Sequence, residues 1–381
     1  MKACFVAVIE ASVKVFLIDH FKTMSPFFDI SVCVNTKDEA FLRPFGVDVT
    51  VIPTQVERKI SLLSDVRTLL HLYRFFRKYK FDVVHSIMPK SGLLSMLAAF
   101  FARVPVRIHT FTGQVWATRK GFTRWLLKSM DKILAFCATY VLVDSHSQRN
   151  FLIDQGIVSP EKSGVIAEGS ICGVDVKRFF PDLKARSEIR AKFAIPENDI
   201  VFLFLGRMNR DKGLLDLAWA FSRIGERYDN AHLIVAGPDE EQIKGQMLEV
   251  CRLYSHMMHF ESFTDSPERY MAAADVFCLP SYREGFGIVV IEAASVEMPS
   301  IGSRIYGVTD TIEDGVTGFL FSAGDPGDLA LKMSTFIENP ELIKKMGKAA
   351  KARAEVLYSK EKVTSAMLDF YKRVTHTTAS A

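Results

Sequence analysis

Residues 200–213 read IVFLFLGRMNRDKG, and the class of fold follows from them. Six apolar residues in a row predict a strand that is buried on both faces. A strand of that kind belongs in a parallel sheet that helices cover on both sides. The strand leads into a loop bounded by Gly206 and Gly213, and a helical pattern begins at Leu214. The stretch is therefore one strand–loop–helix unit of an α/β domain.

The same alternation runs through the whole chain. The expected strands are 3–9, 30–35, 47–52, 82–87, 106–111, 140–144 and 164–167 in the first half, and 200–206, 232–237, 258–260, 276–280, 299–303 and 318–321 in the second. Two blocks of such units predict two doubly wound, Rossmann-like α/β domains that face each other across a ligand-binding cleft. Turn-like residues near 173–182 mark the joint, so we expect domains over 1–178 and 179–357.

Composition excludes several other classes of protein. The chain has 381 residues, 49% of them apolar and 24% charged, which suits two globular domains and excludes extended disorder. The longest nearly unbroken apolar runs have about ten residues, roughly half of what spans a bilayer, so no membrane-spanning helix is expected. The six cysteines include no C-x-x-C pair. This excludes structural zinc and a disulfide framework, and favours a cytoplasmic protein with reduced thiols.

Charge divides unevenly between the halves. Residues 1–180 hold 24 Lys and Arg against 15 Asp and Glu, and residues 181–381 hold 24 against 29. Such asymmetry predicts that the N-terminal half meets something anionic, either nucleic acid, a membrane surface or a lipid phosphate. The alternative is ordinary scatter of charge on a surface. Nucleic acid is the weakest of these partners, because no recognised binding motif accompanies the charge.

The loop after the 200–205 strand has the composition of a phosphate site. Arg207 and Lys212 lie five residues apart in a loop that opens a helix. Arginine offers a planar fork and lysine a point charge, and a helix start adds backbone N–H groups, so the loop suits a polyphosphate. A solvated basic turn is the alternative.

A second loop follows the expected strand 276–280 and carries two carboxylates. Gly285 and Gly287 let backbone approach a ligand just before a helix start. Glu284 and Glu292 stand at E-x7-E spacing, and carboxylates accept charge-assisted hydrogen bonds from sugar hydroxyls. The alternatives are an acid that favours the helix dipole for Glu284, and an exposed helix residue for Glu292.

Five segments together resemble the retaining glycosyltransferases of family 4, which have the GT-B fold. They are the 206–213 loop, E-G-F-G-I-x3-E-A at 284–293, G-V-D and R-F within 173–179, A-D-V-F at 274–277 and D-G-V-T-G at 314–318. Two N-terminal segments, P-K-S-G-L-L at 89–94 and H-T-F-T-G-Q at 109–114, are similar to the subset that builds bacterial surface polysaccharides such as O-antigen or capsule. The resemblance also implies that a C-terminal helix over about 358–381 packs back on the N-terminal domain.

The resemblance assigns roles to residues. Arg207 and Lys212 would hold the donor diphosphate and neutralise the leaving group, Glu284 would bind hydroxyls of the transferred sugar, and Glu292 would bind the ribose. The positions that it marks as donor-binding are Gly206, Gly285, Phe286, Gly287, Ile288 and Glu292. The family needs no bound metal or other cofactor, and this chain has no D-x-D motif for one.

On the N-terminal side the resemblance is less regular. The family commonly has a Gly-rich loop after the first strand, where this chain reads E-A-S-V-K at 10–14. Many members carry a catalytic histidine near 112; here Thr112 stands at that position and His109 is the catalytic candidate, with His85 a second. Lys90 and Gly92, at an expected helix start, are predicted to bind an acceptor phosphate. An exposed lysine at a helix start is the alternative.

Basic and aromatic residues alternate between 116 and 132, and a second basic helix is expected over 62–79. Phe122, Trp125 and Ile133 recur at helical spacing among lysines and arginines. Such a stretch suits the headgroup region of a membrane, so we expect peripheral contact with the inner face of the cell membrane. The alternative is that the apolar stripe packs on the N-terminal sheet.

The sequence therefore predicts a retaining hexosyltransferase. It would move a sugar from a nucleotide-sugar donor, UDP-linked by family habit, to a polyprenyl-diphosphate-linked or saccharide acceptor in surface polysaccharide biosynthesis. A non-catalytic GT-B binding subunit and a nucleotide-sugar epimerase remain alternatives. A phosphorylase needs a longer chain, and a Rossmann oxidoreductase needs the G-x-G-x-x-G that is missing after the first strand.

Overall fold

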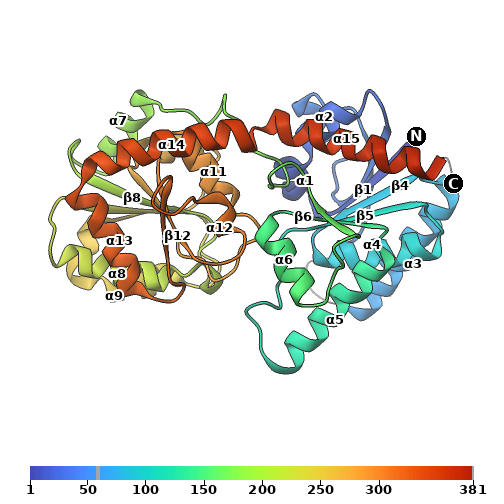
Figure 1. Ribbon diagram of the computed structural model, residues 1–381, viewed down its shortest axis with the longest axis horizontal. Coiled ribbons are helices and arrows are strands. Elements are labelled where there is room, and N and C mark those ends of the chain that lie inside the picture. The colour runs from blue at the N-terminus through green and yellow to red at the C-terminus, as the bar shows by residue number, and fades with distance from the viewer. Residues whose placement is uncertain (57–60, 380–381) are drawn as a thin grey trace. The chain divides into compact units, whose positions relative to one another are not determined.

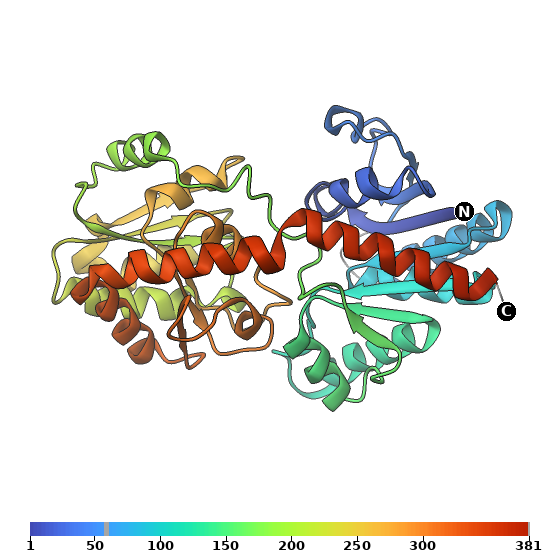
Figure 2. The same ribbon diagram turned by 45° about the horizontal axis from the view of Figure 1, so that its top comes forward.

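A computed structural model of the chain describes residues 1–56 and 61–379 (Figure 1). It divides into two compact units. The first comprises residues 1–173 and the C-terminal helix, and the second comprises Val174–Ser359. Within each unit helices cover a parallel sheet on both faces (Figures 1 and 2). The predicted class, two doubly wound α/β domains, is confirmed.

Within the described residues the first unit has a seven-stranded sheet of order β3-β2-β1-β4-β5-β6-β7. Its strands are β1 (Lys2–Ile9), β2 (Asp29–Asn35), β3 (Thr50–Pro53), β4 (Val83–Ile87), β5 (Val106–Phe111), β6 (Tyr140–Val143) and β7 (Ser163–Val165). Its helices are α1 (Glu10–Phe16), α2 (Ile18–Met24), η1 (Arg43–Phe45), α3 (Leu62–Tyr79), α4 (Pro89–Phe101), α5 (Gly121–Cys137), α6 (His146–Asp154) and α15 (Lys360–Ala379). The strand order reverses between β1 and β4, and ligands of doubly wound sheets generally bind beyond the strand ends at such a switch point.

The second unit has, over the residues described, a six-stranded sheet of order β10-β9-β8-β11-β12-β13. Its strands are β8 (Ile200–Leu205), β9 (Ala231–Ala236), β10 (Met258–Glu261), β11 (Val276–Leu279), β12 (Ser300–Ser303) and β13 (Gly318–Phe321). Its helices are α7 (Leu183–Lys192), η2 (Arg210–Lys212), α8 (Leu214–Gly225), α9 (Ile243–Val250), η3 (Arg252–Met257), α10 (Pro267–Ala273), α11 (Ile288–Ser295), α12 (Val308–Thr311), α13 (Pro326–Glu338) and α14 (Pro340–Tyr358).

Strand β8 shows why a continuous apolar run forms here. Phe202 and Phe204 pack into the core on one face of the sheet, and Val201 and Leu203 pack into a separate core on the other. All four side chains are fully buried. Because both faces of β8 are covered by helices, every position of the strand must be apolar.

The units divide a few residues away from the expected boundaries. The chain was expected to change domain after residue 178, but Val174 already belongs to the second unit, where its N–H donates to Tyr358 O at 2.8 Å. Tyr358 was expected to begin the returning helix. It ends α14 instead, because its buried hydroxyl donates to Asp310 O at 2.9 Å within the second unit.

Helix α15 returns to the first unit, as expected. The Tyr371 hydroxyl lies 2.7 Å from His85 Nδ1, and the Tyr371 ring stacks on Phe5 of β1. These contacts fix the end of the chain against the centre of the N-terminal sheet.

Candidate active site

Two loops of the second unit meet at the carboxyl ends of the neighbouring strands β8 and β11. The Tyr282 N–H donates to Asp211 O at 2.8 Å, and Arg283 Nη2 donates to Asp211 Oδ2 at 2.9 Å. Gly213 allows this approach: it has φ of 65°, and a Cβ there would lie 1.9 Å from Pro280 O. Only glycine fits so close to that carbonyl in a left-handed conformation.

The loops bring together two of the predicted site residues. Lys212 Nζ lies 2.5 Å from Glu284 Oε1, which also accepts a hydrogen bond of 2.7 Å from Ser281 Oγ. Both partners are partly buried, so their attraction is less screened than that of a surface pair. The 206–213 loop and the 284–293 segment therefore form one charged site.

Arg207 points to a third loop, the one that follows β9. Its Nη1 donates to both carboxylate oxygens of Glu240, at 3.2 and 3.0 Å, and Asn209 Nδ2 donates to Glu240 Oε2 at 3.0 Å. Sequence reasoning missed Glu240, because an acid in an acidic turn carries no distinguishing pattern. Gly206 directly follows β8, and its N–H donates to Ala236 O of β9 at 2.9 Å.

The predicted donor-binding residues after Glu284 lie at a helix start. Gly287 caps α11 with φ of 78°, and Gly285 is buried beside it. The Phe286 side chain is buried against the Tyr358 ring, so it faces the core and leaves only its backbone for a ligand. Ile288 is half-buried in the first turn of α11.

Glu292 lies further along α11 and is half-buried. Burial raises the pKa of Glu292 to about 7, the Arg178 cation lowers it, and the Glu268 carboxylate raises it. Arg178 and Glu268 form an ion pair of 2.9 Å. The carboxyl group is therefore poised to change charge near neutral pH.

In the first unit, His109 is closed in rather than open. It lies on β5, fully buried, with Nδ1 2.8 Å from Ser86 Oγ. Burial lowers the pKa of His109 to about 3, so the ring is neutral at physiological pH. Gly92, on α4, packs against this ring: a Cβ at Gly92 would lie 2.4 Å from His109 Cε1. His85 is also buried, with hydrogen bonds of 2.7 Å at both ring nitrogens.

Lys90 lies in the first turn of α4 and is mostly buried. Its Nζ is 2.7 Å from Asp65 Oδ1 in the first turn of α3. Helix α1 begins at Glu10, directly after β1, which accounts for the missing Gly-rich loop: no loop is present at that strand end. The acceptor role of Lys90 and Gly92 stays a prediction.

A buried polar cluster at the ends of β5 and β6 was missed from sequence. The Asp144 N–H donates to Gln148 Oε1 at 3.2 Å, and Gln148 Nε2 donates to Gln114 Oε1 at 3.1 Å. Burial raises the pKa of Asp144 to about 8. The signal was visible: V-L-V-D at 141–144 places a carboxylate directly after a buried strand.

Similarity to known proteins decides the family. Residues 185–353 match the family described as glycosyl transferases group 1, and residues 28–169 match the glycosyl transferase 4-like domain. The capsular polysaccharide biosynthesis glycosyltransferase CapM of Staphylococcus aureus is 30% identical over 347 residues, 90% of each chain. The chain belongs to the family 4 glycosyltransferases. The predicted hexosyltransferase class and the likeness to surface-polysaccharide members are confirmed.

Further similarities are consistent with this glycosyltransferase family. An Escherichia coli UDP-Gal:alpha-D-GlcNAc-diphosphoundecaprenol alpha-1,3-galactosyltransferase is 29% identical over 305 residues, 78% of this chain and 77% of that one. Anabaena HepE, solved with UDP and glucose, superposes with a TM-score of 0.81 at 18% identity, over 98% of this chain and all of that one. Sucrose-phosphate synthase from Thermosynechococcus elongatus gives 0.82 at 19% identity, over 99% and 100%. These structures confirm the GT-B fold.

The described residues offer neither a cluster of metal ligands nor a membrane-spanning helix. Over 1–56 and 61–379, no three His, Cys, Asp or Glu side chains are grouped as metal ligands. Over the same residues, no helix has the length and apolar character needed to cross a bilayer.

Proposed function

We propose that this glycosyltransferase moves a hexose from a UDP-sugar, with retention at the anomeric carbon, to a polyprenyl-diphosphate-linked or saccharide acceptor. The name of the Escherichia coli relative, which gives a UDP-galactose donor and a diphosphoundecaprenol-linked acceptor, supports both substrates. The UDP and glucose in Anabaena HepE support the donor.

The pairing of Lys212 with Glu284 carries the proposal. A nucleotide sugar presents a diphosphate directly beside a hydroxylated ring. A cation 2.5 Å from a carboxylate offers the two matching partners in the same order, Lys212 for the phosphate oxygens and Glu284 for the hydroxyls. Arg207 exchanges Glu240 for a second phosphate oxygen when the donor binds.

The reaction then needs little more than charge stabilisation. The bond between the anomeric carbon and the diphosphate oxygen breaks, and the acceptor oxygen bonds to that carbon on the same face. The acceptor proton passes to the departing diphosphate. Arg207 and Lys212 neutralise the negative charge that grows on the leaving group, which is a large term in a partly desolvated site.

A donor panel tests this function. Purified protein is given UDP- and GDP-sugars with a lipid-diphosphate-linked saccharide, and the anomeric configuration of the product is read by NMR. We expect turnover of a UDP-sugar with retention, and loss of about 10²-fold or more in Glu284→Ala. Glu249→Ala, which removes an exposed carboxylate of α9, is the matched control. An inverted product, a donor isomerised without acceptor, or donor binding without turnover would each refute the proposal.

We also propose that the first unit docks on an anionic membrane. Helices α3, α4 and α5 lie side by side, and their outer faces carry exposed apolar side chains. These are Leu63, Val66 and Leu70 on α3, Phe100 and Phe101 on α4, and Phe122, Trp125, Ile133 and Phe136 on α5. Phe122 and Trp125 are 72% and 62% exposed, which argues against the alternative that this stripe packs on the sheet.

The charges of this surface fit anionic lipid. Arg67, Arg74, Arg77 and Lys78 are exposed on α3, and Lys132 on α5. Of the acidic residues described in these helices, Asp65 pairs with Lys90, and Asp131 is buried and accepts a hydrogen bond of 2.7 Å from Trp116 Nε1. Aromatic side chains among exposed cations favour the headgroup region.

Vesicle flotation tests the docking surface. We expect the protein to float with phosphatidylglycerol-containing vesicles and not with phosphatidylcholine vesicles, and the F122A/W125A variant to stay in solution. Trp219→Ala, which removes an exposed tryptophan from α8, should float like wild type. A double variant that floats as well as wild type would exclude α5 as the docking element.

A further inference from the structure

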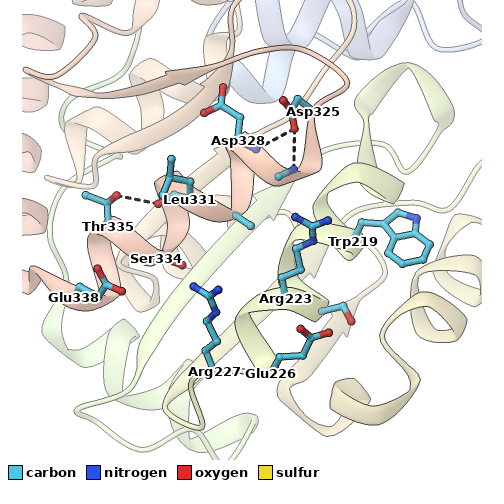
Figure 3. A pocket seen from close by; sticks show the side chains of 13 residues that line it. Trp219, Arg223, Glu226, Arg227, Asp325, Asp328, Leu331, Ser334, Thr335 and Glu338 are labelled. Atoms are coloured by element: carbon cyan, nitrogen blue, oxygen red, sulfur yellow. Dashed lines mark hydrogen bonds between the residues drawn. The ribbon is translucent and has the colours of Figure 1, made fainter.

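The second unit contains a large groove that the catalytic proposal does not use. It lies between α8 and α13 and has a volume of about 1010 Å³ (Figure 3). Side chains of both helices line it, among them Trp219 and Arg223 from α8 and Leu331 and Ser334 from α13. Its size is that of a ligand site rather than of a packing defect.

Two arginines enter the groove without ionic partners. Arg223 lies on α8 and Arg227 in the turn that follows the helix, and both side chains line the groove opposite α13 (Figure 3). Neither forms an ion pair with any residue that the structure describes. Room for Arg223 comes from Gly327: a Cβ at that position would lie 3.3 Å from Arg223 Nη1. The groove therefore holds donors whose hydrogen bonds are available to a ligand.

The carboxylates of the groove are mostly engaged by the protein itself. Asp325 caps α13 by accepting from the N–H groups of Gly327 and Asp328, at 2.9 and 3.0 Å. Asp328 accepts from the Ser322 N–H at 2.8 Å, and Glu338 from the Tyr228 hydroxyl at 2.5 Å. Glu226 also lines the groove. With acids outnumbering arginines, the groove has no net positive charge to attract a phosphate or another anion.

An aromatic side chain stands at one end of the groove. Trp219 is 55% exposed and lies one turn before Arg223 on α8, and Arg227 follows in the turn after the helix. With a volume of about 1010 Å³, at the upper end of the range of ligand pockets, the groove has room for more than a single sugar ring. It starts close to the catalytic loop, since Asp216, one turn before Trp219, accepts a hydrogen bond of 2.5 Å from the Tyr282 hydroxyl.

One ligand class satisfies all these features. A sugar hydroxyl both donates and accepts hydrogen bonds, so it fits a surface where guanidinium, hydroxyl and carboxylate groups alternate. The apolar C–H face of a pyranose fits the flat face of an exposed indole. We propose that the α8–α13 groove binds a neutral oligosaccharide, as a site separate from the donor loops. This goes beyond the proposed transfer reaction and does not depend on it.

Direct binding to the full-length protein tests the groove. The probes are maltohexaose, cellohexaose, mannohexaose and chitohexaose, with hexagalacturonate and inorganic phosphate as anionic probes, each followed by titration calorimetry. We expect at least one neutral hexasaccharide to bind. Trp219→Ala and Arg227→Gln should each weaken it at least about fivefold, which is the scale of one lost aromatic contact or hydrogen bond. Trp125→Ala on α5 is the matched control and should bind as wild type.

Each result of the binding experiment either supports or overturns the proposed sugar site. Loss in both groove variants with an unchanged Trp125→Ala variant supports the site, provided that their melting temperatures match wild type. Since Trp219 and Arg227 lie at the surface, neither substitution should disturb folding. Failure of all four neutral sugars, binding of the anionic probes alone, or unchanged binding in Trp219→Ala would overturn the proposal. These binding results say nothing about donor turnover. The groove proposal can therefore be wrong while the transfer reaction is right, and the reverse.

Discussion

The carboxyl ends of the two sheets differ in how they hold polar side chains. In the second unit the Arg207, Lys212 and Glu284 side chains are 49%, 20% and 14% exposed and are tied in ion pairs. In the first unit His109 and Gln114 are fully buried. Ion pairs whose charges keep some contact with water cost less to open than fully buried polar contacts, so the second unit can exchange its partners for a ligand. A buried polar group is costly to disturb, so the first unit is built to stay fixed.

Among the substitutions that test this contrast, replacing Lys212 should have the largest effect on activity. Lys212→Ala should lower kcat/KM for the donor by about 10²-fold or more, because a preorganised charge opposite the leaving group is lost. The melting temperature should fall only modestly, because the Glu284 carboxylate keeps its hydrogen bond from Ser281 Oγ and some contact with water. Steady-state kinetics with thermal melting measures both.

Arg210→Ala is the matched control for this prediction. Arg210 lies in the same loop with the same charge, and its side chain is exposed. It should keep near-normal turnover. If both variants lose activity equally, the loop acts through its net charge and Lys212 has no special place in the site.

A substitution in the first unit should act on stability instead. In Gly92→Ala the new Cβ would lie 2.4 Å from His109 Cε1 and 2.7 Å from Leu134 Cδ1. Overpacking of this kind costs about 1–3 kcal/mol of unfolding free energy. Removing the ring should relieve part of it, so Gly92→Ala with His109→Ala should be less destabilised than the two single variants added together.

Chemical denaturation of the four proteins in this cycle gives the coupling. Simple additivity would show that Gly92 and His109 do not constrain each other. His109 itself was a catalytic candidate, and the cycle separates that role from packing because it measures unfolding rather than turnover.

Asp144 should make a smaller contribution to stability, one that depends on pH. Burial raises the pKa of Asp144 to about 8, well above that of an unfolded aspartate. The protonated form therefore stabilises the fold at low pH, and this contribution is lost as pH rises through about 8. Asp144→Asn carries no such proton. The difference in melting temperature, variant minus wild type, should grow between pH 5 and pH 9.

Glu292 and Asp131 also have raised pKa values, but they are present in both proteins, so their contributions to stability cancel in this difference. Asp154→Asn, at an exposed site on α6, should give a difference that stays flat with pH. A flat difference for Asp144→Asn as well would mean that its carboxyl group is solvated in the folded protein.

The same contrast explains what the sequence could and could not predict. Strand β8 was predictable because burial on both faces leaves an unbroken apolar run. The meeting of Lys212 with Glu284 was also predictable, because neighbouring parallel strands bring their carboxyl-end loops together. Glu240 was not, since it is an acid in an acidic turn and its partner lies in a different loop.

The burial of polar side chains at the carboxyl ends of the strands in the first unit was harder to predict. His109 lies in a segment that also fits an exposed strand end, and only the packing of α4 against β5 closes it in. The returning helix was expected two residues too early. The helical pattern of the sequence continues through Tyr358, whereas in the structure α14 ends there and Ser359 separates it from α15. Such choices depend on tertiary contacts that no local pattern records.

The smallest expected effect is that of a chelator. If Arg207 and Lys212 supply the positive charge that the leaving diphosphate needs, turnover in EDTA should stay within about twofold of the untreated rate. The Lys212→Ala variant gives a sharper test. Added magnesium should restore part of its activity, because a divalent ion bound to the donor diphosphate would replace the missing charge. Wild-type activity that is abolished by EDTA and restored by magnesium would show that the two cations are insufficient. The ion pairs of Arg207 and Lys212 would then serve to hold the loops rather than to bind the donor.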